Sequence, residues 1–162
     1  MKTAILYHSE SGNTGRFANT LADALMQAGH TVNSVQLQTT APVKKASVRD
    51  KQEITFRNLP DLSSYDLIIF GGPVWAFGPS PVIIAAIKQC TGLEGKTALP
   101  IASMGFPFRC LGGTASLRYM NRELVLKGAK VLPGSICRQM MNKLDSDIAQ
   151  QTAKIVKSLS SL

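Results

Sequence analysis

The sequence contains few charged residues, few cysteines and no long apolar run. Charged residues make up 17% of the chain, and the 10 acidic residues are outnumbered by 18 basic ones. No apolar stretch approaches the roughly 18 consecutive residues that a membrane-spanning helix needs. The first residues, Met1 to Tyr7, place one lysine before a short strand instead of the apolar core of a signal peptide. We therefore expect no membrane span and a cytoplasmic protein.

Cysteine and histidine are too few and too scattered for a disulfide framework or a metal site. Cys90, Cys110 and Cys137 are odd in number, widely separated and in no CxxC pair, so we expect reduced thiols. His8 and His30 have no carboxylates around them at metal-ligand spacing. The sequence therefore predicts no metal site and structural roles for both histidines.

The basic excess gives a formal net charge of +8 and a pI near 9.7. Two clusters carry much of it: Lys44, Lys45, Arg49, Lys51 and Arg57, then Arg109, Arg118, Arg122, Lys127, Lys130 and Arg138. A solvated basic surface is the default interpretation, and attraction of an acidic protein partner or an anionic ligand is the alternative. Nucleic acid is not expected, because no basic motif interleaved with aromatic residues is present.

Buried-strand patterns alternate with amphipathic helical patterns along the chain. Strands are expected at residues 2–8, 31–37, 65–72, 96–103 and 130–137, and helices at 13–28, 80–90, from a cap at Thr114 onward and at the C-terminal end. The segment 39–64 is the least regular, with a short helix expected to begin at Pro42. This alternation predicts one α/β domain over residues 1–162, a parallel sheet with helices on both faces.

The turn after the first strand has the residues of an anion-binding site. Ser9, Ser11 and Thr14 offer hydroxyls, Asn13 offers an amide, and Gly12 lets the backbone turn with positive φ. The helix that follows directs unpaired N–H groups and the positive end of its dipole at whatever lies in front of it. The turn has no lysine and no GxGxxG, so it is neither of the common nucleotide loops. The alternative is a capped turn that binds nothing.

Two further loops have aromatic residues and glycines in equivalent places. The loop after the third strand contains Trp75 and Phe77, and the loop after the fourth contains Phe106 and Phe108. Ligands of open parallel sheets bind at the carboxyl ends of the strands, at the switch point of the winding. The three loops are therefore expected to converge on a site for a flat aromatic molecule with a phosphate at one end.

These residues resemble the flavodoxin-like family of FMN-binding proteins. The run Ser9-x-Ser11-Gly12-Asn13-Thr14 resembles that family's phosphate signature, residues 65–75 are similar to its third strand and flavin loop, and residues 126–131 are similar to the approach to its last strand. The resemblance covers nearly the whole chain in the right order. It implies a flavodoxin-like doubly wound, five-stranded parallel sheet with strand order 2-1-3-4-5.

The resemblance also implies an FMN site. Side chains and backbone of the first turn would hold the phosphate, and Trp75 would lie against the isoalloxazine, although a core tryptophan is the alternative. The residues expected to bind FMN are Ser9, Glu10, Ser11, Gly12, Asn13, Thr14, Pro73, Val74, Trp75, Ala76, Phe77, Gly78, Ser103, Met104, Gly105, Phe106, Cys110 and Gly112.

Four of the loop side chains have open alternatives. Phe77, Phe106 and Phe108 could instead pack inward or line a subunit contact. Cys110 could approach the flavin, but filling space is the favoured interpretation.

The chain departs from plain flavodoxins in charge and in one loop. Those electron carriers are generally acidic, whereas this chain is basic, so their usual redox partners are not expected. The loop from Met104 lacks the acidic, tyrosine-bearing sequence of many of them.

The favoured function is an FMN-binding redox protein that transfers electrons through bound flavin, with no catalytic side chain. The first alternative is an NAD(P)H-dependent quinone or flavin reductase, in which Arg109 could favour the 2′-phosphate of NADPH. The second alternative is a cofactor-free binding module with a basic docking face. The expected partners are a redox protein, acidic in character, or NAD(P)H and a quinone, and homo-oligomerisation stays open.

Overall fold

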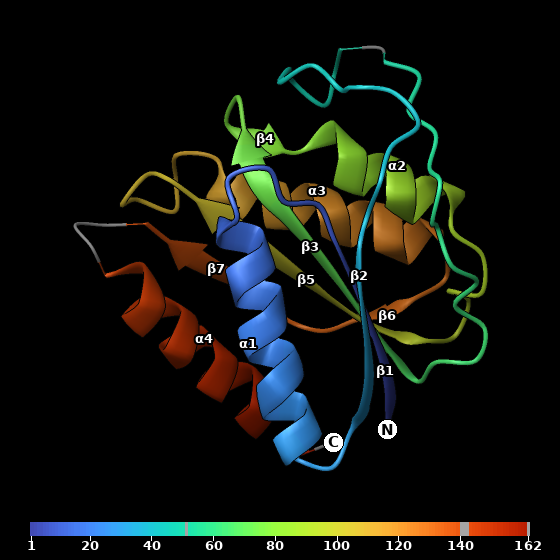
Figure 1. Ribbon diagram of the computed structural model, residues 1–162, viewed down its shortest axis with the longest axis vertical. Helices are drawn as coiled ribbons and strands as arrows, with labels where there is room; N and C mark the ends of the chain where they lie inside the picture. Colours follow the sequence, from blue (N-terminus) through green and yellow to red (C-terminus); the bar gives the residue numbers. More distant parts are fainter. Residues whose placement is uncertain (51, 140–142, 162) are drawn as a thin grey trace.

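A parallel sheet with helices on both faces forms the core of the computed structural model, which describes residues 1–50, 52–139 and 143–161 (Figure 1). The strands are β1 (Lys2–Tyr7), β2 (Thr31–Gln36), β3 (Leu67–Trp75), β4 (Gly78–Pro79), β5 (Thr97–Met104), β6 (Lys130–Val131) and β7 (Ser135–Arg138). The helices are α1 (Asn13–Gln27), α2 (Pro81–Gln89), α3 (Gly113–Leu126) and α4 (Leu144–Leu159).

The strand order is β2-β1-β3-β5-β6, with β7 also paired to β5. The pairs along this path are parallel, which confirms the predicted order 2-1-3-4-5. The predicted fifth strand is divided into β6 and β7 around Pro133 and Gly134. Proline has no N–H for the ladder, and a Cβ on Gly134 would lie 2.8 Å from the carbonyl oxygen of Pro100.

The register of the central strands aligns the ends of three of them. Tyr7 of β1 pairs with Gly71 of β3, and Pro73 of β3 pairs with Ser103 of β5. The segments that follow these strands therefore leave the sheet at one carboxyl edge, where ligands of doubly wound sheets bind.

Helices α1 and α4 cover one face of the sheet, and α2 and α3 cover the other (Figure 1). Phe17 of α1 and Ile148 of α4 pack with Ile69 on one face, whereas Ile83 of α2 packs with Phe70 on the other. Successive residues of β3 thus point into different apolar layers, which is why this strand is apolar at every position from Leu67 to Phe70.

The predicted loop after the third strand is a hairpin in the structure, because β3 continues to Trp75 and pairs with β4. Val74 pairs with Pro79 and Trp75 with Gly78, which leaves a two-residue turn. Ala76 and Phe77 occupy this turn at φ 46° and 62°. Positive φ at both central residues suits the twist of a tight hairpin but is unfavourable for residues with a Cβ.

The predicted start of α3 is also wrong. The N-cap is Gly112 at φ 102°, and not Thr114, which is exposed inside the first turn. The hydroxyl of Ser116 donates to the Gly112 carbonyl (2.7 Å).

The helix predicted from Pro42 is absent from the described residues of the segment 39–64. Side chains satisfy the backbone there instead, which removes the need for helical hydrogen bonds. The Gln52 amide bonds the N–H and the carbonyl of Lys44, and the Asp50 carboxylate accepts from the N–H of Ser47.

Candidate functional site

The start of α1 faces the carboxyl edge of the sheet, and its N-cap residue, Gly12, has no side chain to cap the first N–H groups. Gly12 is the N-cap at φ 88°, and a Cβ placed there would meet no atom within 4 Å. The Ser9 hydroxyl accepts from the N–H of Gly15 (3.1 Å), which closes the turn around this open space. An uncapped helix start with room in front of it can hold an anion.

Thr14 and Ser103 connect this turn to the end of β5. Their hydroxyl oxygens lie 2.6 Å apart, and the two residues are only 2% and 4% exposed. Two hydroxyls that share one hydrogen bond leave the second hydrogen free for a further acceptor. The pair can therefore donate to a ligand placed between the turn and β5.

Trp75 lies half-buried at the end of β3 and is positioned by His8. The two rings meet edge to face, with centroids 5.1 Å apart and planes at 85°. Nδ1 of His8 is 3.0 Å from the Ser80 hydroxyl, which itself accepts from the N–H of Val82 at the start of α2. The chain therefore holds the indole through the histidine.

Burial lowers the pKa of His8 below its usual 6.5, although the carboxylate of Glu10 acts in the opposite direction. A neutral imidazole can accept at Nδ1 the proton that the Ser80 hydroxyl donates. Only a purely structural role was predicted for His8. Its place directly before Ser9, at the end of a central strand, is the signal that could have shown its position beside the site.

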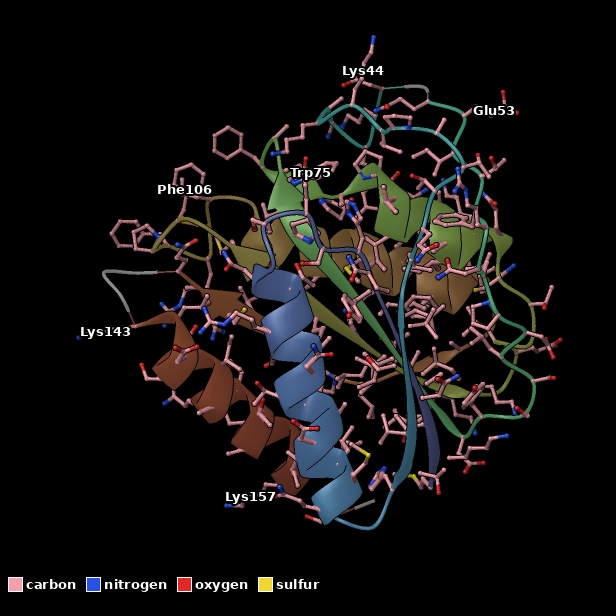
Figure 2. All side chains as sticks on the ribbon, in the orientation of Figure 1. Lys44, Glu53, Trp75, Phe106, Lys143 and Lys157 are labelled. Carbon is pink, nitrogen blue, oxygen red and sulfur yellow. The ribbon has the colours of Figure 1, made fainter. Side chains whose placement is uncertain are left out.

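Phe77 and Phe106 join the two aromatic loops. Their rings stack with centroids 6.2 Å apart and planes at 17°, and the residues are 64% and 51% exposed. Trp75 and Phe106 lie at the same end of the molecule (Figure 2). Phe108 is 65% exposed as well, so the alternative in which these phenylalanines pack inward is wrong.

Cys110 is exposed. The interpretation of Cys110 as a space-filling side chain is therefore wrong, because its side chain does not enter the core.

Sequence reasoning missed two residues that touch the predicted site. The carbonyl of the Gln139 side chain accepts from the Asn13 amide (2.8 Å), across 126 positions, while the Gln139 N–H donates to the carbonyl of Met104 (2.8 Å). Lys45 pairs with Glu10 at 3.0 Å. No local sequence pattern predicts these contacts, because each joins segments that are distant in the sequence.

The structure thus brings the predicted residues of the turn 9–14, the hairpin 73–78 and the loop 103–112 to one edge of the sheet. Lys51 of the first basic cluster lies outside the described residues. Among the described residues, no three His, Cys, Asp or Glu side chains gather as a metal site would require. No helix of the described residues is long and apolar enough to cross a membrane.

Comparison with known proteins identifies the family. Residues 1–137 match the family model of NADPH-dependent FMN reductase. The chain belongs to this family. Among curated proteins, an NAD(P)H dehydrogenase (quinone) of Azorhizobium caulinodans is 32% identical over 101 residues, which are 60% of this chain. The matched part is 51% of that relative, so the chain spans about half the length of the curated protein it matches.

Solved structures show that this family member has the flavodoxin-like fold. A flavodoxin of Streptococcus pneumonia TIGR4 is 18% identical, with a TM-score of 0.69 and 99% of both chains covered. Oxidised flavodoxin 1 of Bacillus cereus is 22% identical, with a TM-score of 0.65 and 97% and 98% covered. A flavoprotein of Lactobacillus acidophilus NCFM in complex with FMN is 21% identical, with a TM-score of 0.64 and 93% and 98% covered.

The residues present fit an FMN molecule. The uncapped start of α1, the open space beside Gly12 and the spare hydroxyl hydrogen of the Thr14 and Ser103 pair suit a phosphate ester. A Cβ on Gly105 would also meet nothing within 4 Å, so the backbone of the loop after β5 is open to a ligand there.

Proposed function

We propose that the protein is an FMN-dependent oxidoreductase that is reduced by NAD(P)H and passes its electrons to a quinone or a free flavin. The family match supports this function over the electron-carrier interpretation favoured from the sequence. The name of the Azorhizobium relative, which includes a quinone, supports it further. The observation that carries it is the convergence of an uncapped helix start with two aromatic loops at one sheet edge.

In this proposal the turn from Ser9 to Thr14 holds the FMN phosphate. Backbone N–H groups at the start of α1 and the hydroxyls around them neutralise its charge without a lysine. The hairpin carrying Trp75 and the loop from Ser103 to Gly112 hold the isoalloxazine on its two sides. The contact between Thr14 and Ser103 joins the phosphate turn to the start of this loop.

FMN, when bound, would supply the redox chemistry, which is two-electron transfer from a nicotinamide to an acceptor. The protein contributes position. His8 orients Trp75, and the stacked rings of Phe77 and Phe106 join the hairpin to the loop after β5. We propose no acid, base or nucleophile among the side chains.

The test combines reconstitution with anaerobic reduction. Protein loaded with FMN should be yellow and show quenched Trp75 fluorescence, NADPH or NADH should bleach the flavin, and a quinone should restore the colour. A flavin that binds but is not bleached by either dinucleotide would overturn the reductase and leave the carrier. A protein that binds no flavin would leave the cofactor-free binding module.

A matched pair of variants on α1 separates site effects from helix effects. Thr14→Val removes a hydroxyl from the proposed phosphate site, whereas Thr20→Ala removes one from an exposed position of the same helix. Only Thr14→Val is expected to weaken FMN binding. Equal losses in both variants would argue against the phosphate assignment.

A further inference from the structure

A cavity of about 290 Å³ adjoins the hairpin, and no residue of the turn that we assign to the phosphate of FMN lines it. Three parts of the chain form it: the basic segment at residues 47–49, the hairpin at 76–79, and α3. Side chains that line it include Val48, Arg49, Phe77, Pro79, Ala115 and Tyr119. It therefore combines apolar walls with one aromatic ring of α3 and one guanidinium.

The cavity adjoins the proposed flavin site through shared residues. Ala76 and Phe77 line it, and the same two residues form the turn that we expect to border the isoalloxazine. Both adopt the positive φ that suits this two-residue hairpin turn. A ligand that extends across this turn would contact the flavin site at one end and the cavity at the other.

The charges around the cavity are mainly positive. Arg49 lines it, is exposed, and forms no ion pair with the described residues. Arg122 is exposed and continues the helical stripe of Ala115 and Tyr119. The nearest acidic residue in the sequence is Asp50, whose carboxylate already accepts from the Ser47 N–H (2.9 Å).

The backbone of Arg49 is fixed beside the cavity. The Ser47 hydroxyl accepts from the Arg49 N–H (3.2 Å), so Ser47, Arg49 and Asp50 form a compact, internally bonded turn. Lys45, a few residues earlier, pairs with Glu10 and ties the segment to the first turn of the site. Figure 2 shows Lys44, of the same segment, at the Trp75 end of the molecule.

We infer that this cavity binds the adenosine end of NADPH, with the guanidinium of Arg49 on the 2′-phosphate and the adenine against Tyr119 and Val48. The inference rests on the proposed function, because the nicotinamide must reach the flavin on the other side of the hairpin. Guanidinium groups match the geometry of phosphate oxygens, and adenine suits a flat apolar wall. Arg109, which the sequence suggested for this phosphate, is not among the residues that line the cavity.

The inference predicts a preference for NADPH that depends on Arg49. FMN-loaded protein and its Arg49→Ala variant are titrated calorimetrically with 2′,5′-ADP, with 5′-AMP and with inorganic phosphate. Loss of a charged hydrogen-bond partner should weaken 2′,5′-ADP binding at least about tenfold and change 5′-AMP binding much less. The kcat/KM for NADPH relative to NADH should fall by a similar factor.

Lys154→Ala is the matched control, because it removes the same charge from an exposed position on α4, on the opposite face of the sheet. This variant should keep the affinity of the parent protein for 2′,5′-ADP. Equal losses in Arg49→Ala and Lys154→Ala would mean a general attraction of charge and would overturn the site. Inorganic phosphate that binds as tightly as 2′,5′-ADP would overturn the nucleotide assignment.

The outcomes distinguish this inference from the proposed function. If NADPH bleaches the flavin and Arg49→Ala changes neither 2′,5′-ADP binding nor the NADPH preference, the cavity assignment is wrong and the reductase stands. If neither dinucleotide bleaches the flavin, the proposed function is wrong. Loss of 2′,5′-ADP binding in Arg49→Ala, measured directly, would still support the cavity as a nucleotide site.

Discussion

The hydroxyl oxygens of Thr14 and Ser103 lie 2.6 Å apart in a buried contact between residues separated by 89 positions. Thr14 belongs to the first turn of α1 and Ser103 to the end of β5. The contact therefore joins the anion turn, residues 9–14, to the loop at residues 103–112. A change in either residue is therefore expected to affect both flavin binding and the stability of the protein without flavin.

Thr14→Ala and Ser11→Ala are both expected to weaken FMN binding, whereas only Thr14→Ala is expected to lower the stability of the apoprotein. Truncation of Thr14 leaves Ser103 without its partner, at a cost of about 1 kcal/mol in the free energy of unfolding. Ser11 is exposed, so its loss should cost the apoprotein almost nothing. Urea unfolding of the apoprotein and a flavin fluorescence titration measure the two effects. Equal destabilisation by both variants would contradict the role of the buried contact.

Gly112→Ala and Gly12→Ala test how tightly α3 is held against the hairpin. Both glycines are N-caps at positive φ, so each replacement carries a backbone penalty of about 1 kcal/mol. A Cβ on Gly112 would also lie 2.6 Å from the Cα of Phe77, whereas one on Gly12 meets nothing within 4 Å. Gly112→Ala should therefore lose a further 1 to 3 kcal/mol, roughly, of unfolding free energy.

Chemical denaturation of the two apoproteins measures this difference. Because Gly112 contacts the hairpin, its variant should also change the fluorescence of Trp75, which the Gly12 variant should leave nearly unchanged. Similar unfolding free energies for the Gly112 and Gly12 variants would mean that the hairpin at Phe77 moves aside at little cost in free energy.

The local patterns of the sequence are sufficient for the alternation of strands and helices and for the meeting of three connections at one sheet edge, whereas the strand order came from the family resemblance. Buried strands such as residues 67–70 are apolar at every position because helices cover both faces. The anion turn is a short local motif followed by a helix. Such features depend on neighbours in the chain, so they can be predicted from it.

The errors fall where distant segments decide the conformation. β3 extends to Trp75 because Pro73 pairs with Ser103 of β5 and because β4 folds back on it. The start of α3 is set by the close approach of Gly112 to Phe77. Gln139 bonds Asn13 across 126 positions. The contacts across β3 and β5, between Gly112 and Phe77 and between Gln139 and Asn13 leave no periodic or local signal in the sequence.

The pH dependence of stability is expected to include a contribution from His8. Burial lowers its pKa in the folded protein below 6.5, so the unfolded chain takes up the proton first as the pH falls. Stability from this group is complete above about pH 6.5 and is lost as the pH falls from there to the lower pKa of the folded state. His8→Gln should make the unfolding free energy less sensitive to pH in this window.

His30→Gln is the comparison for this experiment. The pKa of His30 is also lowered, by burial and by the N-terminal charge. Its Nδ1 lies 3.1 Å from the hydroxyl of Thr3, near the start of β1, whereas Trp75 lies at the opposite edge of the parallel sheet. Only His8→Gln should alter the pH dependence of Trp75 fluorescence. An identical fluorescence profile in both variants would contradict the contact between His8 and Trp75.

Cys110 is expected to be the one fast-reacting thiol. Burial raises the pKa of Cys90 to about 11 and that of Cys137 to about 12, and both side chains lie in the core, whereas Cys110 is exposed. A thiol reagent in mildly alkaline buffer should label one cysteine rapidly, and Cys110→Ser should abolish this phase. Because the loop 103–112 is proposed to border the isoalloxazine, FMN should slow the labelling. A rate unchanged by FMN would remove Cys110 from the flavin site while leaving the assignments of the anion turn and of Trp75 intact.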